Sequence, residues 1–250
     1  MLHSFWIPHP ALCILLTMKC AIHQPQFLPW LGYLNKISTC DVFVFLDNVQ
    51  YKKNEYQNRN RVRIGNEAKW LTVPVSFKFG DTINQTLIAK DPRWRKKIIS
   101  SIEYSYGKSP FFKVFTPRLL EIIHSDWSNL AAINQSTVEW LINCFEIKTR
   151  LLVCSQLPDF SMDPTGRLID ICRHVGADTY LSGAGAHDYL DMEQFKKSGL
   201  NIEFQEYLHP VYPQCYDGNK QVHEFLSHLS ALDGLMNCGG GEQGRKILGL

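Results

Sequence analysis

The pattern of apolar and polar residues near the start of the chain predicts a βαβ unit. Lys19–His23 is a short apolar run typical of a buried strand, and apolar residues at positions 30, 31, 34 and 37 have the spacing of a helix. Asp41–Asp47 is an almost continuous apolar run, which is typical of a strand covered on both faces. This order of strand, helix and strand predicts two parallel strands joined by a crossover helix.

The rest of the chain alternates between the two periodicities. Further strands are predicted at 69–75, 82–89, 151–154, 179–181 and 201–207, and further helices at 93–106, 110–124, 129–145, 167–175, 192–198 and 225–238. We therefore predict one Rossmann-like α/β domain over residues 18–238, with a mostly parallel sheet and a helical insertion from about 85 to 147. Residues 1–17 are predicted to be a non-essential extension, and residues 239–250, which begin with three glycines, a disordered tail.

The composition is that of a folded globular protein. Hydrophobic residues make up 45% of the 250 residues, charged residues make up 20%, and the mean hydropathy is −0.17. These values exclude disordered, collagen-like and coiled-coil chains. The apolar run Ala11–Leu16 is too short to span a bilayer. The eight cysteines form no CxxC pair and lie mostly in apolar runs, which predicts free thiols, a cytoplasmic location and no metal site.

Charge is unevenly distributed, although the formal net charge is only +2. Between Gln50 and Lys113 there are 14 Lys and Arg against 5 Asp and Glu, whereas the remainder has 12 against 19. This basic segment indicates an anionic small-molecule ligand, such as a nucleotide sugar or an acyl donor. No RNA-binding, helix-turn-helix or zinc-finger pattern accompanies it, so a nucleic-acid partner is not expected. An exposed basic hairpin without a ligand is the alternative.

The loop after the first predicted strand is a candidate catalytic site. Ligands of parallel α/β sheets bind at the carboxyl ends of the strands, and His23 and Asp47 end neighbouring strands of the predicted βαβ unit. An unperturbed imidazole has a pKa near 6.5, so His23 is the candidate general base and Asp47 the candidate group that orients it. The alternative is a tight structural turn braced by prolines.

Two further segments carry candidate binding groups. Gln57–Arg61 offers guanidinium forks and amides that suit phosphate or carboxylate groups. Ser182–Ala186 follows a predicted strand, and its small side chains allow a ligand to approach the backbone. With the first loop and neighbouring residues, these segments give the predicted substrate-binding set: Gln24, Gln26, Trp30, Tyr33, Gln50, Asn58, Arg59, Asn60, Arg61, Ser182, Gly183 and Tyr189.

The order of these motifs resembles the WbqC-like protein family. The residues that carry the resemblance are His23–Tyr33, Asp41–Gln50, Gln57–Arg61, Trp70–Val75, Tyr180–Gly183 with Tyr189–Leu190, and Ser230–Asn237. The resemblance implies a cytoplasmic role in the biosynthesis of bacterial surface polysaccharide (O-antigen). Ala184 and Ala186 depart from it, because a more glycine-rich loop is expected there.

Three functions are open at this point. The first is a transferase that acts on an activated sugar or its amino group with an anionic donor. The second is a non-catalytic nucleotide-binding or scaffold protein of the same pathway. The third is a nucleotidylyltransferase-like enzyme, because Trp30–Tyr33 is similar in layout to the HxGH loop of those enzymes, although Trp30 and Tyr33 replace both histidines. The sequence identifies no cofactor and defines no oligomeric state.

Overall fold

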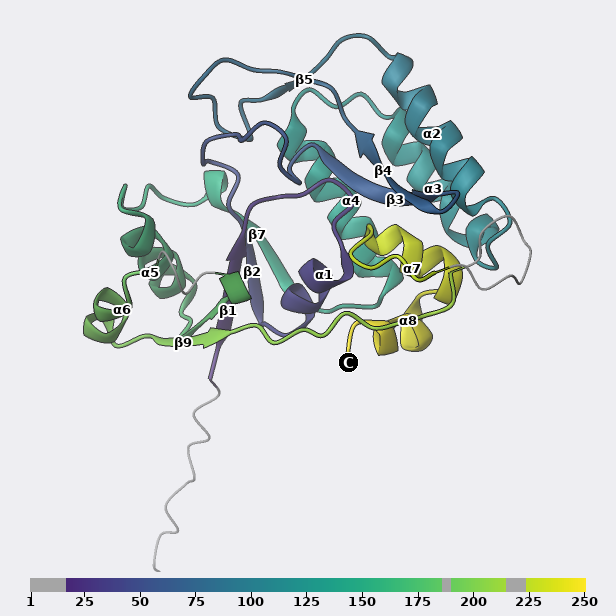
Figure 1. Ribbon diagram of the computed structural model, residues 1–250. Coiled ribbons are helices and arrows are strands. Elements are labelled where there is room, and N and C mark those ends of the chain that lie inside the picture. Colours follow the sequence, from purple (N-terminus) through teal and green to yellow (C-terminus); the bar gives the residue numbers. More distant parts are fainter. Residues whose placement is uncertain (1–16, 186–189, 215–223) are drawn as a thin grey trace, which may run out of the picture.

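A parallel five-stranded sheet forms the centre of the protein (Figure 1). The computed structural model describes residues 17–185, 190–214 and 224–250. The strands of the sheet stand in the order β7-β2-β1-β8-β9, and each neighbouring pair is parallel. Their bounds are β1 (Lys19–His23), β2 (Val42–Phe45), β7 (Arg150–Val153), β8 (Thr179–Ser182) and β9 (Asn201–Phe204). The predicted Rossmann-like α/β fold is therefore confirmed.

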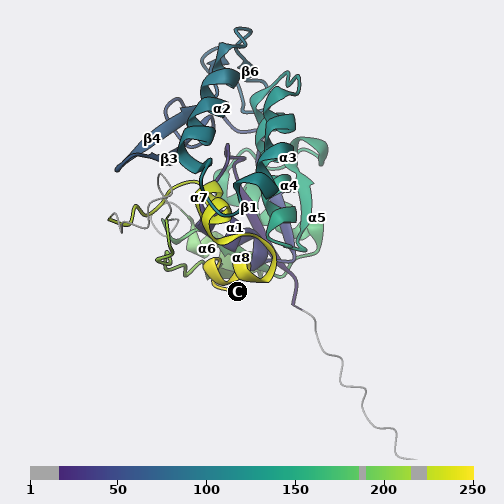
Figure 2. The same ribbon diagram turned by 90° about the vertical axis from the view of Figure 1, so that its right-hand side faces the viewer.

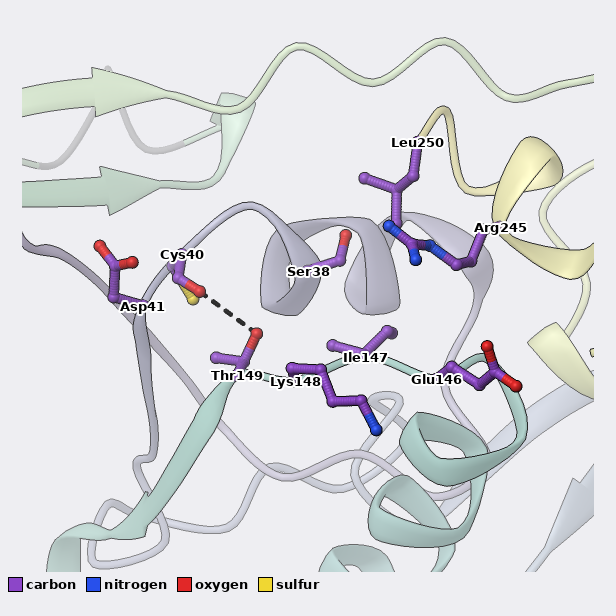
Figure 3. A pocket seen from close by; sticks show the side chains of 9 residues that line it. All are labelled: Ser38, Cys40, Asp41, Glu146, Ile147, Lys148, Thr149, Arg245 and Leu250. Atoms are coloured by element: carbon purple, nitrogen blue, oxygen red, sulfur yellow. Dashed lines mark hydrogen bonds between the residues drawn. The ribbon is translucent and has the colours of Figure 1, made fainter. Parts of the chain in front are cut away.

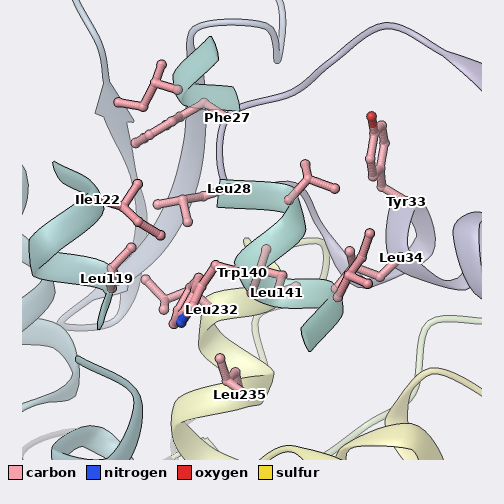
Figure 4. Packing of buried hydrophobic residues seen from close by; sticks show 14 of the residues in the cluster. Phe27, Leu28, Tyr33, Leu34, Leu119, Ile122, Trp140, Leu141, Leu232 and Leu235 are labelled. Atoms are coloured by element: carbon pink, nitrogen blue, oxygen red, sulfur yellow. The ribbon is translucent and has the colours of Figure 1, made fainter. Parts of the chain in front are cut away.

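Helices cover both faces of this sheet. The helices of the described residues are α1 (Leu31–Ser38), α2 (Arg93–Tyr106), α3 (Phe112–His124), α4 (Leu130–Cys144), the short 3-10 helix η1 (Cys154–Gln156), α5 (Pro164–Val175), α6 (Met192–Ser198), α7 (Ala231–Cys238) and α8 (Gly241–Ile247). Cys20 and Ile22 of β1 belong to the apolar cluster with α5 and α6, whereas Ala21 belongs to the cluster with α1, α4 and α7. Figure 4 shows this second cluster, in which Leu34 of α1, Leu141 of α4 and Leu232 of α7 lie together. The central strands are apolar on both faces because both faces are covered.

The strand order reverses beside β1. The chain runs from β1 through α1 to β2 and outward to β7, and it then returns through α5 to β8 on the other side of β1. The two halves of the sheet diverge at the carboxyl ends of β1 and β8, which is the switch point where α/β sheets bind ligands. The pairing of these strands stops at Ala21 and Leu181, so Ile22 and Ser182 lie beyond it.

A large insertion separates the neighbouring strands β2 and β7. It contains the antiparallel hairpin of β3 (Arg59–Ile64) and β4 (Glu67–Thr72), the short pair β5 (Val75–Ser76) and β6 (Leu87–Ile88), and helices α2 to α4. The three helices lie inside the predicted range of 85–147, but the insertion also includes the β-structure that precedes them. Figure 2 shows α2, β3 and β4 at the end of the molecule opposite to α6 and α8.

The prediction of a disordered tail is wrong. Residues 241–247 form α8, Leu248 is fully buried, and the amide Nδ2 of Asn35 in α1 donates to the backbone oxygen of Leu248 at 2.8 Å. The glycines form a turn between two helices, with Gly239 at φ 86° after α7 and Gly241 at φ 56° at the start of α8. Such φ values favour glycine, so the glycine run marks a tight connection.

Other predicted bounds differ by a few residues. The last strand of the sheet ends at Phe204, and the helix predicted from 225 begins at Ala231. The predicted extension 1–17 lies outside the described residues except for Thr17. No helix of the described residues is both long enough and apolar enough to cross a bilayer.

Candidate functional site

A pocket of about 590 Å³ opens at the carboxyl edge of the sheet, beside the start of α5. Its wall combines apolar side chains with an imidazole, an amide and two cations: Ile22, His23, Gln24, Leu46, Val49, Lys52, Met162, Pro164, Arg167, Leu168 and Tyr180. Among the described residues, no carboxylate belongs to this lining. The pocket lies at the switch point, where the fold leads one to expect a ligand.

His23 stands in this pocket as a neutral imidazole. Its Nδ1 lies 3.1 Å from the backbone oxygen of Gln24, so Nδ1 carries the proton and Nε2 remains an acceptor. Burial, and secondly the ammonium group of Lys36, lower the pKa of His23 to about 4. The ring of Tyr33 packs edge-on against the imidazole at 5.0 Å between centroids. At neutral pH, Nε2 can therefore accept a proton or a hydrogen bond.

Asp47 does not form the predicted couple with His23. Its Oδ1 accepts from the backbone N–H of Ser155 at 2.9 Å, and its Oδ2 accepts from the Ser155 hydroxyl at 2.6 Å. These bonds join the end of β2 to η1, and no hydrogen bond within the described ranges connects the carboxylate to the imidazole. The backbone oxygen of Gln24 orients His23 instead, so the role predicted for Asp47 is corrected to a structural one.

The two cations of the pocket are absent from the predicted set. Lys52 lies on the exposed segment after β2, and Arg167 lies in the first turn of α5. The Nε of Arg167 donates to the backbone oxygen of Ser161 at 3.0 Å, which fixes the guanidinium beside the pocket. Asp163 followed by Pro164 marks the start of α5. That pair was a usable signal, because a crossover helix begins at the carboxyl edge of a parallel sheet.

Arg59 and Arg61 do not line this pocket. They lie on β3, and their guanidinium carbons are 4.2 and 5.7 Å from the ring centre of Trp70 on β4. Arg59 also donates to the backbone oxygen of Asn54, and Arg61 donates to that of His228 at 3.2 Å. Both side chains belong to the surface of the hairpin, where cation–π contacts hold them.

The amides of the same run are buried structural groups. The Nε2 of Gln57 donates to the side-chain oxygen of Gln24 at 2.7 Å, and the Nδ2 of Asn60 donates to the backbone oxygen of Leu28 at 2.8 Å. The Nδ2 of Asn58 donates to a backbone oxygen between β4 and β5. Gln57 and Asn60 tie the loop after β1 to the insertion, whereas the bond of Asn58 lies within the insertion, so all three support the pocket rather than line it.

Helix α4 holds the same loop from another side. The Nδ2 of Asn134 donates to the backbone oxygens of Pro25 and Gln57, at 3.1 and 2.7 Å. Asn134 is fully buried, so both bonds form away from water. The loop that presents His23 is thus fixed by side chains of the insertion.

The aromatic members of the predicted set separate into two places. The hydroxyl of Tyr33 donates at 3.1 Å to the backbone oxygen that also bonds His23, so Tyr33 belongs to the site. Trp30 stacks on the imidazoles of His209 and His228, with centroids 6.3 and 5.3 Å away, and does not line the pocket. The side-chain oxygen of Gln26 is buried without a hydrogen-bond partner among the described residues.

Ser182 and Gly183 lie at the carboxyl end of β8, across the switch point from β1. Ser182 is fully buried, and its Oγ has no hydrogen-bond partner in the described part of the chain. A Cβ placed on Gly183 would meet no atom of this part within 4 Å. Gln50 is exposed and pairs through its backbone with Thr82. Tyr189 lies outside the described residues.

A second pocket, of about 330 Å³, lies at the amino edge of the sheet (Figure 3). Its lining carries charges of both signs, on Glu146, Lys148 and Arg245, and the hydroxyl of Thr149 donates to the backbone oxygen of Cys40. It is therefore less suited to an anion than the pocket at the carboxyl edge. Within the described ranges, no group of three or more His, Cys, Asp or Glu side chains is arranged to hold a metal ion.

The parallel sheet and the basic pocket at its switch point define a Rossmann-like α/β protein. The chain belongs to the WbqC-like protein family, whose model matches residues 24–244. It is 30% identical over 225 residues to a Mycobacterium tuberculosis protein named "Uncharacterized protein Rv1507c", and this match covers 88% of the chain and 94% of that protein. No solved structure matches the chain. The family match includes Gln24, Lys52 and Arg167, and it begins immediately after His23.

Proposed function

We propose that the protein is a transferase of bacterial surface-polysaccharide assembly. It acts on an activated sugar or its amino group, and its anionic donor binds in the switch-point pocket. The observation that carries the proposal is the charge of this pocket, in which Lys52, Arg167 and a neutral His23 meet without a carboxylate among the described lining residues. The assignment to surface-polysaccharide assembly rests on the resemblance to the WbqC-like family.

The pocket supplies the groups for a general-base transfer. A hydroxyl or amino group of the sugar gives its proton to Nε2 of His23, and its oxygen or nitrogen forms a bond to the electrophilic carbon of the donor. The bond from that carbon to the leaving phosphate or thiolate breaks, and the leaving group keeps the electron pair. Lys52 and Arg167 stabilise the negative charge of the donor and of the leaving group.

Calorimetric titration with nucleotide sugars and CoA thioesters tests the position of the site. We expect Arg167→Ala and Lys52→Ala each to weaken binding by about tenfold or more, because a hydrogen bond to a charged group contributes about 1.5–3 kcal/mol. Lys53→Ala is the matched control for Lys52, because Lys53 is its exposed neighbour outside the pocket. Arg59→Ala is the control for Arg167, and both controls should bind as the unchanged protein does.

Two results would contradict the proposal. Binding that is lost in Arg59→Ala and retained in Arg167→Ala would place the site on the hairpin. Tight binding without turnover of any donor and acceptor pair would favour the non-catalytic nucleotide-binding or scaffold protein. In a transferase, His23→Ala loses turnover and retains donor binding.

A further inference from the structure

The pocket at the carboxyl edge of the sheet is apolar in its depth. Ile22 of β1, Tyr180 of β8 and Leu168 of α5 line it and are only 3%, 4% and 9% exposed, so they form its inner part. Leu46 and Val49, from the segment after β2, also line it and are half-buried. We call these five residues the apolar wall. Their side chains carry a single polar atom, the hydroxyl oxygen of Tyr180.

The cations lie at the mouth of the same pocket. Lys52 is exposed, and Met162, whose sulfur accepts from the guanidinium of Arg167 at 3.6 Å, is 85% exposed. Arg167 itself is half-buried, and its bond to the backbone oxygen of Ser161 holds it there. The anionic part of a ligand therefore finds its partners next to water, whereas the part that enters the pocket meets the apolar wall.

Few polar groups of the pocket are open to a ligand between the mouth and the wall. His23 offers Nε2 as an acceptor, because its Nδ1 is engaged with the backbone oxygen of Gln24. The side-chain oxygen of Gln24 already accepts from Gln57 at 2.7 Å. The described lining holds no carboxylate, the group that binds ribose hydroxyls in many Rossmann folds. A nucleoside or a sugar against the apolar wall would thus leave hydroxyl groups without partners, which costs free energy.

We propose that the donor of this pocket is an acyl thioester of coenzyme A, with its acyl chain against the apolar wall and its phosphates at the mouth beside Lys52 and Arg167. An acyl chain has no hydrogen-bonding group to satisfy, and its burial against apolar side chains is favourable. The thioester carbon joins the two parts of this ligand. His23 follows Ile22 of the wall directly and is half-buried, so it stands at that junction. The inference rests on the proposed function and selects an acyl donor over a nucleotide sugar.

The transfer step is then an acylation. A neutral amino group or a hydroxyl group of the sugar attacks the carbonyl carbon of the thioester, and Nε2 of His23 takes its proton. The bond from the nitrogen or oxygen to that carbon forms, the carbon–sulfur bond breaks, and the coenzyme A thiolate leaves with the electron pair. The imidazolium gives its proton to the thiolate, so the products are an acylated sugar and the free thiol, and His23 is neutral again.

Calorimetric titration with free coenzyme A and with its acetyl, butyryl, hexanoyl and octanoyl thioesters tests this assignment. Free coenzyme A should bind through the cations of the mouth. Each methylene group that reaches the apolar wall should then tighten binding by about fourfold, until the chain is longer than the wall. UDP-glucose, a nucleotide sugar with comparable phosphates, should bind more weakly than the octanoyl thioester.

A change in the apolar wall should alter the dependence on chain length. Leu46→Ala removes part of the wall, so the gain in affinity per methylene group should be smaller, while free coenzyme A binds as before. Leu157→Ala is the matched control, because Leu157 is also half-buried and packs against the same apolar cluster as Leu46 but does not line the pocket. It should keep the full dependence. Val49→Ala gives the same test if Leu46→Ala fails to fold.

Three results would overturn the acyl donor. They are equal affinities for free coenzyme A and all of its thioesters, tighter binding of UDP-glucose than of any thioester, and a dependence on chain length that Leu46→Ala and Val49→Ala leave unchanged. In the last case the acyl chain would bind elsewhere. A dependence that these variants reduce, without transfer of the acyl group to any sugar, would contradict only the proposed function.

Discussion

The backbone oxygen of Gln24 determines which chemistry is open to His23. It bonds both the Nδ1 of His23 and the hydroxyl of Tyr33, so the imidazole is fixed in one tautomer with Nε2 as the acceptor. A carbonyl cannot titrate, so this orientation does not depend on the protonation of a neighbour. The buried ammonium of Lys36 further favours the neutral ring.

Acid should destabilise the protein in part through His23. Its pKa is about 4 in the folded protein, below the ordinary value of 6.5, so the unfolded chain binds the proton first as the pH falls. The contribution to stability is complete above pH 6.5 and is lost as the pH falls toward 4. In His23→Gln, the urea midpoint should therefore decline less steeply over this window than in the unchanged protein.

His124→Gln is the control, because this histidine is exposed at the end of α3. It should leave the dependence of the urea midpoint on pH as it is. Parallel declines for the unchanged protein and His23→Gln would show that the imidazole titrates alike in the folded and unfolded states.

At the scale of elements, the insertion is part of the site. Asn134 of α4 and Asn60 of β3 donate to backbone oxygens of the loop after β1, from two directions. The loop after β1 lacks the regular backbone hydrogen bonds of a helix or sheet, so its backbone N–H and C=O groups need these side-chain partners. The helix and the hairpin therefore fix the path that presents His23 and Gln24 to the pocket.

Asn134→Ala should lower the free energy of unfolding by about 2–4 kcal/mol. The change leaves two buried carbonyl oxygens, of Pro25 and Gln57, without their donor, and each costs about 1–3 kcal/mol. Urea denaturation measures the loss. Asn143→Ala on the exposed face of the same helix should change stability by less than about 0.5 kcal/mol. Similar losses in both variants would show that the two hydrogen bonds of Asn134 are not the cause, because alanine has the higher helix propensity and the change by itself should not destabilise the helix.

The two strands and the helix of the first βαβ unit could be predicted from sequence, because each is short and its apolar residues recur with the spacing of a single type of element. The burial of Lys36 could not, since a lysine in a helix is ordinarily solvated, whereas here its Nζ donates to the backbone oxygen of Ile22 inside the protein. The position of Arg59 depends on the register of the hairpin, which brings Trp70 of β4 opposite β3. Arg167 lies far from His23 in the sequence, and the two meet only because the connection from β7 to β8 places the start of α5 beside the end of β1.

At the scale of the whole molecule, α8 completes the core beneath α1. Leu248 is fully buried, and its backbone oxygen accepts from Asn35, while Gly234 of α7 lies against Ile247. The glycine run before α8 looked like the start of a tail because flexible segments and tight turns share that composition. A tight turn forms where apolar residues after the glycines can pack against the core. Leu248 packs in this way.

Leu248→Ala should destabilise the protein by about 2–4 kcal/mol, because it removes a buried side chain and leaves a cavity against α1. Chemical denaturation gives the value. Leu250→Ala is the matched comparison, because Leu250 is 43% exposed, and it should cost less than about 1 kcal/mol. Equal effects of the two changes would mean that the segment after α8 does not contribute to the core.

The central strand, β1, pairs with β2, which is close to it in the sequence, and with β8, which is far from it. The N–H of Met18 donates to the side chain of Asp178, 160 residues later, whereas the partner on the other edge follows directly after α1. Contacts of such separation form slowly, because a long loop must close before any of them is made. The crevice between β1 and β8 is therefore absent from a partly folded chain, and in a refolding experiment the recovery of ligand binding would report that the whole chain had reached its native topology.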